Sequence, residues 1–274
     1  MMPLVYQFNY RFSGNFNKPL ILFLHGFMGN CHEFDTAISL LSQHFYCLTV
    51  DLPGHGKTEV LDNGEYYTIP NTSQGIINLL DTLNISQCFL VGYSMGGRLA
   101  LYLTLHFPER FPQVVLESAS PGLASEIERL ERVKLDNQIA NKLTRISQGT
   151  NNDFAVFLLT WYSQPIFGSI KNHSTFEQLI ASRLENNPNQ LAKSLRWMGT
   201  GKHPSLWEEI KGLQQPVLLL VGEYDHKFID INRKMADICK CQLKIIPNAA
   251  HNIHLENSQA FVDNLNKFFF NHEV

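Results

Sequence analysis

The sequence contains no long hydrophobic run, and neither sign of charge is in large excess. No stretch of its 274 residues approaches the roughly 18 consecutive apolar residues that a membrane-spanning helix needs. The formal net charge of −3 gives no global field that would favour nucleic acid or an anionic membrane as a partner. The N-terminal segment lacks the apolar core of a secretory signal peptide. We therefore expect a cytoplasmic protein that binds neither nucleic acid nor membranes.

Cysteine is also scarce, with five residues in the chain. An odd number of cysteines in a protein without an export signal indicates reduced thiols rather than a disulfide framework. Cys239 and Cys241 stand apart from other possible ligands, so they do not indicate a zinc site. No cluster of residues points to a metal or an organic cofactor, and we expect none.

Buried strands and helices alternate along the chain. Six short apolar runs are typical of strands that are covered on both faces, at 19–25, 45–51, 87–93, 113–118, 216–222 and 241–247. Segments with helical spacing of apolar residues lie at 34–43, 73–83, 94–105 and 260–269. This alternation predicts an α/β fold with a doubly wound, mostly parallel sheet. Residues 4–12 predict an antiparallel edge strand or hairpin.

Residues 122–210 break this rhythm, because no buried-strand run occurs among them and their apolar spacing is helical. An insertion of this length in an α/β core commonly acts as a lid. We predict a helical lid inserted after the sixth strand, between core segments 1–121 and 211–274.

Gly92, Ser94 and Gly96 form the pattern G-x-S-x-G between a predicted strand and a predicted helix. In a nucleophile elbow this pattern places a serine on a sharp, strained turn. The pattern alone often marks no more than a turn. Its position between strand and helix favours Ser94 as a catalytic residue.

A second segment, 24–29, follows an earlier buried strand whose end faces the same edge of the sheet. We predict that the backbone N–H groups of Phe27 and Met95 form an oxyanion hole, which would stabilise negative charge on a substrate oxygen. A plain strand-to-helix turn is the simpler interpretation, and the occurrence of both segments in this order argues against it.

An active serine needs a base, and the base needs a carboxylate that orients it. His251 follows the last predicted strand and is the preferred base, with His254 as the alternative. Asp225 follows the strand at 216–222 and is the preferred carboxylate, with Asp230 as the alternative. The resulting order Ser, Asp, His is the one that accompanies this type of elbow.

Arg98 stands four residues after Ser94, so both lie on one face of the predicted helix. This helix is expected to be buried, where an unpaired guanidinium would be costly. Arg129, Arg132 and Arg183 lie on predicted lid helices, and each alone is typical of a solvated surface residue. Opposite Arg98 in one cavity, they would form a site for carboxylates, which arginine binds in a bidentate geometry.

With these residues assembled, the chain resembles the α/β-hydrolase superfamily over nearly its whole length. The residues that carry this resemblance are 24–29, 51–56, 92–97, Asp225 and His251. The chain more narrowly resembles the 2-succinyl-6-hydroxy-2,4-cyclohexadiene-1-carboxylate synthases, the pyruvate-eliminating enzymes of menaquinone and phylloquinone biosynthesis. This narrower resemblance rests on 92–101, 116–123, 160–167, 179–187, 222–228 and 249–257.

The narrower resemblance implies roles for individual residues. Ser94, Asp225 and His251 would form a catalytic triad. Substrate contacts would come from Tyr93, Arg98, Arg129, Arg132, Trp161 and Arg183. Either Arg129 or Arg132 could be the main carboxylate ligand, since the first lid helix varies in sequence. Met95 stands where leucine is usual, which leaves the backbone N–H unchanged.

The resemblance also implies a carbon–oxygen lyase reaction. The substrate would be a small polycarboxylate, a succinyl-bearing cyclohexene with an enolpyruvyl ether. Ser94, activated by His251, would remove a proton from it, and pyruvate would leave without water or an acyl-enzyme. The family needs no cofactor, and we expect a monomer or a weak homo-oligomer. The alternatives are an ester or C–C-bond hydrolase acting on an acidic substrate, and a catalytically silent binding protein.

Overall fold

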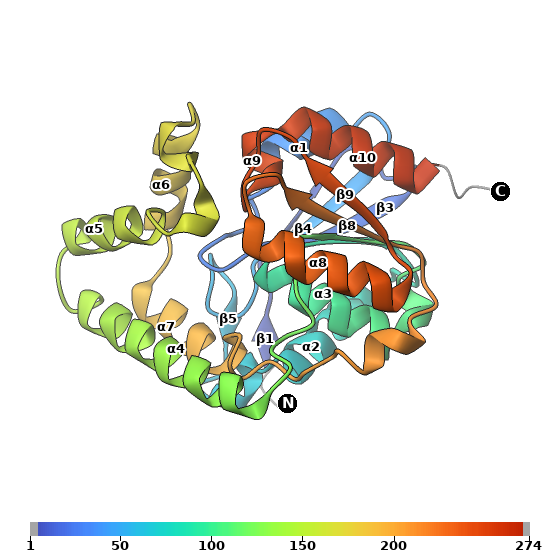
Figure 1. Ribbon diagram of the computed structural model, residues 1–274. Helices are drawn as coiled ribbons and strands as arrows, with labels where there is room; N and C mark the ends of the chain where they lie inside the picture. The colour runs from blue at the N-terminus through green and yellow to red at the C-terminus, as the bar shows by residue number, and fades with distance from the viewer. Residues whose placement is uncertain (1–4, 271–274) are drawn as a thin grey trace.

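The computed structural model describes residues 5–270, and a seven-stranded sheet runs through its centre (Figure 1). Along the chain its strands are β2 (Tyr10–Ser13), β3 (Leu20–Leu24), β4 (Tyr46–Val50), β6 (Phe89–Tyr93), β7 (Val114–Glu117), β8 (Val217–Gly222) and β9 (Gln242–Ile246). Their spatial order is β2-β4-β3-β6-β7-β8-β9. β2 pairs antiparallel with β4 at one edge, and all other neighbours are parallel. The short strands β1 (Tyr6–Gln7) and β5 (Glu59–Val60) pair separately.

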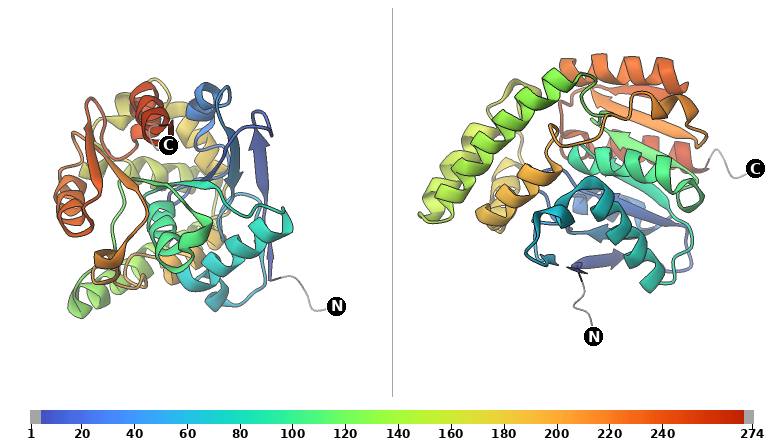
Figure 2. Two further views of the ribbon diagram at one scale, coloured as in Figure 1. Left: turned by 90° about the vertical axis from the view of Figure 1, so that its right-hand side faces the viewer. Right: turned by 90° about the horizontal axis from the view of Figure 1, so that it is seen from below.

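Helices cover both faces of the sheet (Figures 1 and 2). On one face lie α1 (Asp35–Leu41), α9 (Ile253–Glu256) and α10 (Ser258–Phe270), and on the other lie α2 (Ile69–Thr82), α3 (Met95–His106) and α8 (His226–Cys239). Short 3₁₀ helices are η1 (Gly64–Tyr67), η2 (Pro108–Arg110) and η5 (Glu209–Gly212). Within residues 5–270, no helix is long and apolar enough to cross a membrane.

Strand β3 shows why the predicted runs are apolar throughout. Leu22 and Leu24 pack in the cluster that includes α2 and α3, whereas Ile21 and Phe23 pack in the cluster that includes α1 and α10. Successive side chains of a strand point to opposite faces, so a strand covered on both sides has no solvated position. Each of the six predicted runs contains one strand of the sheet, which confirms the doubly wound, mostly parallel α/β fold.

A helical segment lies between β7 and β8. It contains α4 (Glu126–Ile146), α5 (Asn151–Trp161), η3 (Pro165–Phe167), η4 (Ile170–Asn172), α6 (Phe176–Leu184) and α7 (Pro188–Met198). Figures 1 and 2 show its long helices gathered beyond one end of the sheet. It follows β7, the seventh strand of the chain and the fifth of the main sheet, rather than the predicted sixth strand. The two-residue strand β5 is too short to detect as an apolar run, whereas β1 lies within the predicted element at 4–12. The role of this segment as a lid stays a prediction, and so do its boundaries at 122 and 210. The two ends of the predicted core, 1–4 and 271–274, lie outside the described residues.

The expectation that every thiol is reduced is wrong for one pair of cysteines. Cys239 and Cys241 form a disulfide, while Cys31, Cys47 and Cys88 are free and buried. Lys240 between them has a left-handed backbone (φ 56°), which ends α8 in a tight turn. The turn brings the two cysteine Cα atoms to 5.3 Å, within the range that a disulfide requires.

A buried network of charged side chains ties the helical segment to the core. Arg183 of α6 donates hydrogen bonds to Glu33 Oε1 at 2.6 Å and to the Tyr162 hydroxyl at 2.9 Å. Glu33 Oε1 also lies 3.2 Å from His254 Nε2, and His254 Nδ1 lies 2.8 Å from Glu117. Although burial raises it, the charges of Arg183 and His254 hold the pKa of Glu33 well below its usual range.

Removal of Arg183 from this network should destabilise the protein. Because Glu33 would lose its closest cation while remaining buried, we expect Arg183→Met to lower the free energy of unfolding by about 3–5 kcal/mol. Urea denaturation measures this change. The control is Arg233→Met, because Arg233 is 61% exposed and contacts Asp230 only at 3.8 Å. A similar small loss in both variants would contradict a stabilising role for the buried network.

His254 should make stability depend on alkaline pH. Burial alone would lower the pKa of His254, but the neighbouring carboxylates of Glu117 and Glu33 outweigh this effect and raise the pKa to about 9. This folded-state pKa exceeds the unfolded value of about 6.5, so protonation of His254 stabilises the fold. The stabilisation, about 3 kcal/mol, is complete below pH 6.5 and is lost as the pH rises through 9. Urea denaturation across this range should show a decline that is smaller in His254→Gln. An equal loss of stability with rising pH in the parent and in His254→Gln would argue against a charged His254.

Candidate active site

Ser94 lies in a strained turn between β6 and α3. Its backbone angles are φ 50° and ψ −105°, which residues other than glycine rarely adopt. Close packing on both sides excludes side chains: a Cβ on Gly92 would lie 2.5 Å from the Gly96 carbonyl oxygen, and one on Gly96 would lie 2.1 Å from the Leu24 carbonyl oxygen. The segment thus has the strand-turn-helix conformation that the G-x-S-x-G pattern predicts, with the serine at the turn.

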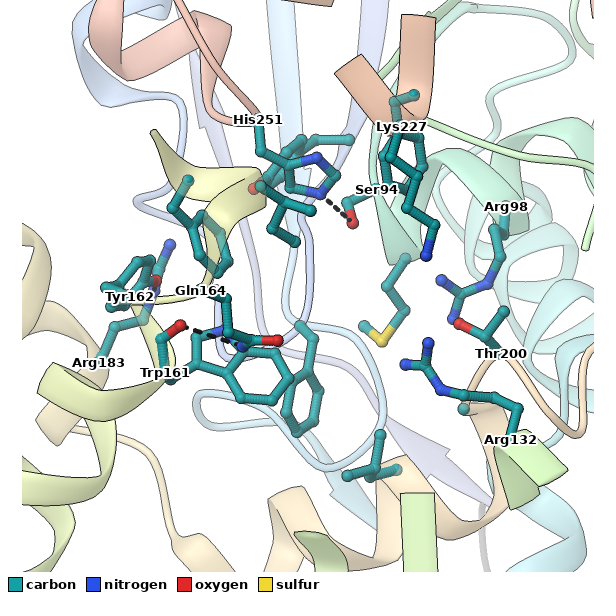
Figure 3. Close-up of a pocket in the computed structure, with 18 residues that line it drawn as sticks. Ser94, Arg98, Arg132, Trp161, Tyr162, Gln164, Arg183, Thr200, Lys227 and His251 are labelled. Carbon is teal, nitrogen blue, oxygen red and sulfur yellow. Dashed lines mark hydrogen bonds between the residues drawn. The ribbon is translucent and has the colours of Figure 1, made fainter. Parts of the chain in front are cut away.

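Ser94, His251 and Asp225 form a hydrogen-bonded chain. His251 Nε2 lies 3.0 Å from Ser94 Oγ (Figure 3), and His251 Nδ1 lies 2.6 Å from Asp225 Oδ2. Both partners of the second contact are almost fully buried. A carboxylate can only accept, so Nδ1 carries the proton in this contact, and Nε2 is left free to accept the Ser94 hydroxyl proton.

The alternative histidine and aspartate lie elsewhere. His254 is held between Glu33 and Glu117 in the buried network, and its ring packs 4.8 Å from that of Tyr93. Asp230 is on the exposed side of α8, with its side chain 82% accessible. Neither residue lies within hydrogen-bond distance of Ser94, so the geometry favours His251 and Asp225.

The two residues predicted for the oxyanion hole both have a backbone N–H group that is open to a ligand. Met95 is the first residue of α3, where the helix leaves backbone N–H groups without an intrahelical partner. Within residues 5–270, neither the Phe27 nor the Met95 amide donates to a protein acceptor. Both residues line the cavity that contains Ser94. Their assignment as the oxyanion hole stays a prediction.

A cavity of about 180 Å³ lies between the core and the helical segment. The predicted site residues that line it are Phe27, Tyr93, Ser94, Met95, Arg98, Arg132, Trp161, Arg183 and His251. Asp225 lies behind His251, and Arg129 does not line the cavity. The structure therefore brings Arg132, rather than Arg129, to the site. Within the described part of the chain, no group of three or more His, Cys, Asp or Glu side chains could hold a metal ion.

Arg98 carries a buried charge without a carboxylate partner. The residue is only 9% exposed, and Nη2 donates to the Met198 carbonyl oxygen at 3.0 Å. No ion pair joins Arg98 to a carboxylate within residues 5–270. Burial, and then the nearby charge of Arg132, lower the pKa of Arg98 to about 10, although the charge of Asp136 raises it. A buried guanidinium in this state favours the binding of an anion.

The other predicted arginines of the cavity already have partners. Arg132 Nε lies 2.7 Å from Asp136 within α4, and Arg183 pairs with Glu33. Each of these ion pairs largely compensates the charge of its arginine. Among the predicted arginines that line the cavity, Arg98 is therefore the one without a carboxylate partner, and the carboxylate site itself stays a prediction.

Sequence reasoning missed part of the cavity lining, namely Tyr162, Gln164, Ile166, Phe167, Leu195, Gly199, Thr200, Lys227 and Phe228. Lys227 adds a further cation, and Figure 3 shows its ammonium group on the same side as Arg98 and Arg132. One feature of the sequence could have indicated that Lys227 lies at the site. Lys227 follows Asp225 by two residues, at the carboxyl end of a parallel strand, where ligand-binding residues of such sheets commonly lie.

Comparisons with known proteins agree with this geometry. A family model described as the alpha/beta hydrolase fold matches residues 19–258. A Bacillus subtilis protein provisionally named 2-succinyl-6-hydroxy-2,4-cyclohexadiene-1-carboxylate synthase is 34% identical over 88% of this chain and 86% of the relative. The Serratia proteamaculans protein named as that synthase is 33% identical over 94% of this chain and 96% of the relative. The solved structure of MenH from S. aureus has a TM-score of 0.87 and 31% identity, covering 98% of this chain and 99% of that chain. The chain therefore belongs to the α/β-hydrolase superfamily and, within it, to the family of 2-succinyl-6-hydroxy-2,4-cyclohexadiene-1-carboxylate synthases.

Proposed function

We propose that this protein is the pyruvate-eliminating synthase of menaquinone or phylloquinone biosynthesis. It would convert 2-succinyl-5-enolpyruvyl-6-hydroxy-3-cyclohexene-1-carboxylate into 2-succinyl-6-hydroxy-2,4-cyclohexadiene-1-carboxylate. The names of the relatives support this proposal. The observation that carries it is the uncompensated, buried Arg98 in the same cavity as Ser94. A generic esterase pocket has no need of a buried cation, whereas a substrate with several carboxylates provides its counter-ion.

The proposed reaction begins with a proton transfer. Asp225 orients His251, His251 Nε2 takes the hydroxyl proton of Ser94, and the Ser94 oxygen removes a proton from a ring carbon beside the succinyl ketone. The electrons of that C–H bond shift into the ring and break the C–O bond to the enolpyruvyl group. Pyruvate leaves as its enolate and takes up a proton. No water is consumed, and no bond forms between Ser94 and the substrate.

Charge stabilisation would be the main contribution of the remaining site residues. Negative charge develops on the ketone oxygen as the proton leaves, and the N–H groups of Phe27 and Met95 would donate to it. Arg98, Lys227 and Arg132 would hold the substrate carboxylates on one side of the cavity. Tyr93, Trp161 and Arg183 would supply the remaining contacts, Arg183 through the guanidinium hydrogens that Glu33 and Tyr162 do not use.

A hydrolase is the second candidate, because the same contact would serve it. Ser94 Oγ is 3.0 Å from His251 Nε2, as attack on an ester carbonyl would also require. In that reaction Ser94 would be acylated and water would release the acid. The two candidates differ in the covalent intermediate and in the product, so both can be distinguished experimentally.

The decisive measurement is pyruvate release from the authentic intermediate. We expect equimolar pyruvate and cyclohexadiene, with no burst of covalent enzyme. Ser94→Ala removes the oxygen that accepts the substrate proton and should lower kcat by at least about 10³-fold while leaving ligand binding near normal. Ser39→Ala, at an exposed serine of α1, is the control. Unchanged turnover in Ser94→Ala would contradict the mechanism, and a stable acyl-serine without pyruvate release would favour the hydrolase.

Replacement of Arg98 tests the carboxylate site. Because the substrate anion would lose a buried partner, we expect Arg98→Ala to lower kcat/KM by at least about 30-fold, and Arg98→Lys to retain only part of the activity. Without ligand, Arg98→Ala should be no less stable than the parent, since it removes an uncompensated charge. The control is Arg233→Ala at the surface. Steady-state kinetics measure these changes. An equal loss of kcat/KM in Arg98→Ala and Arg233→Ala would refute the proposed role of Arg98 in binding a substrate carboxylate.

A further inference from the structure

The loop that carries His251 is held by one carboxylate oxygen. Glu256, the last residue of α9, accepts hydrogen bonds at Oε2 from the backbone N–H groups of Ala250 at 2.9 Å and Asn252 at 3.3 Å. These are the residues on either side of His251. The N–H of His251 itself donates to the Ile166 carbonyl oxygen of the helical segment at 3.2 Å. Three consecutive amides are therefore fixed, two by the core and one by the helical segment.

We propose that Glu256 is a positioning residue that holds the backbone on both sides of His251, so that the imidazole stays in hydrogen-bond reach of Ser94 and Asp225. The proposal rests on the proposed role of His251 as the base. Asp225 fixes only one ring nitrogen, and a ring held at one point can still swing with its backbone. Two hydrogen bonds that bracket the residue remove this freedom. Preorganisation of this kind matters because a displacement of about 1 Å can reduce a rate about 10²-fold.

Opposing effects act on the carboxyl group of Glu256. The side chain is partly buried, and burial raises the pKa of Glu256 to about 7 although the amides of Ala250 and Asn252 lower it. Glu117 also raises that pKa, and His254 lowers it. Bonds from amides to an ionised acceptor are stronger than neutral ones, which offsets part of the burial cost.

The three amide hydrogen bonds come from different parts of the molecule, two from the core and one from the helical segment. If the helical segment moved, His251 would lose its bond to Ile166, whereas both bonds to Glu256 lie within the core. Glu256 would then preserve the position of the base while substrate enters or products leave. A purely structural role predicts a different result, namely lower stability with an unchanged kcat in the folded fraction.

Three variants of Glu256 test the proposal. We expect Glu256→Ala to lower kcat for pyruvate release roughly 10- to 100-fold while KM changes by less than about threefold. Glu256→Gln keeps an oxygen acceptor in the same place and should retain activity within about threefold of the parent. Glu256→Asp keeps the charge but is one methylene too short, so it should resemble Glu256→Ala. It also serves as the test variant if Glu256→Ala does not fold.

A matched control is a carboxylate that bonds to the same loop from outside it. Glu223 Oε2 accepts a hydrogen bond from the Asn248 N–H at 3.1 Å, three residues before His251, and it does not line the cavity. Glu223→Ala should leave kcat unchanged. The proposal is overturned if Glu256→Ala and Glu256→Asp keep the parental kcat, if Glu223→Ala loses as much activity, or if Glu256→Gln is as impaired as Glu256→Ala.

A second readout separates this proposal from the proposed function. The rate at which a fluorophosphonate ester labels Ser94 depends on His251 as base but not on the natural substrate. It should fall in Glu256→Ala and Glu256→Asp in parallel with kcat, and it should be preserved in Glu256→Gln. If the parent protein releases no pyruvate, the proposed function fails, while the labelling rates still decide the role of Glu256.

Discussion

The backbone turn at Ser94 is the constraint on which the rest of the site depends. A positive φ at a serine is tolerated only because β6, α3 and the end of β3 pack so closely that Gly92 and Gly96 have no room for a side chain. The same turn starts α3 at Met95, so a helix N-terminus faces the cavity. It also fixes where the next helical turn projects, which places Arg98 in the cavity wall. One strained residue thus positions the Ser94 oxygen, an amide donor and a cation.

Charge compensation distinguishes the cations around this turn. Arg183 and Arg132 have carboxylate partners at 2.6 and 2.7 Å, so each forms an ion pair with little net charge in the cavity wall. Arg98 donates a hydrogen bond to a backbone carbonyl and has no ion-pair partner. Burial and the charge of Arg132 lower its pKa more than the charge of Asp136 raises it. An anionic ligand would relieve this unfavourable arrangement. Binding energy is then directed to the end of the cavity beside Ser94, where the proposed chemistry takes place.

The sequence predicted the features that depend on local pattern. Buried parallel strands are apolar at every position, so their runs could be located, and residues directly after strand ends, such as Asp225 and His251, could be expected at one edge of the sheet. Features set by packing could not be predicted. Glu33 and Arg183 are 150 positions apart, and nothing local shows that they meet. Arg129 and Arg132 lie three residues apart on α4, and only the packing of that helix brings Arg132 to the cavity.

The site is also shared between the core and the helical segment in a way that the order of motifs does not reveal. Ile166 accepts the N–H of His251, and Arg183 reaches Glu33, which contacts His254 beside Tyr93. A displacement of the helical segment would therefore change both the cavity wall and the support of the proposed base. The α/β-hydrolase core supplies a serine, a histidine and an aspartate to many different reactions, so these three residues alone do not determine the chemistry. In this cavity Arg98 and Lys227 come from core helices α3 and α8, and the helical segment adds Arg132. The segment also reaches the proposed base through the Ile166 carbonyl and the ring of Phe167.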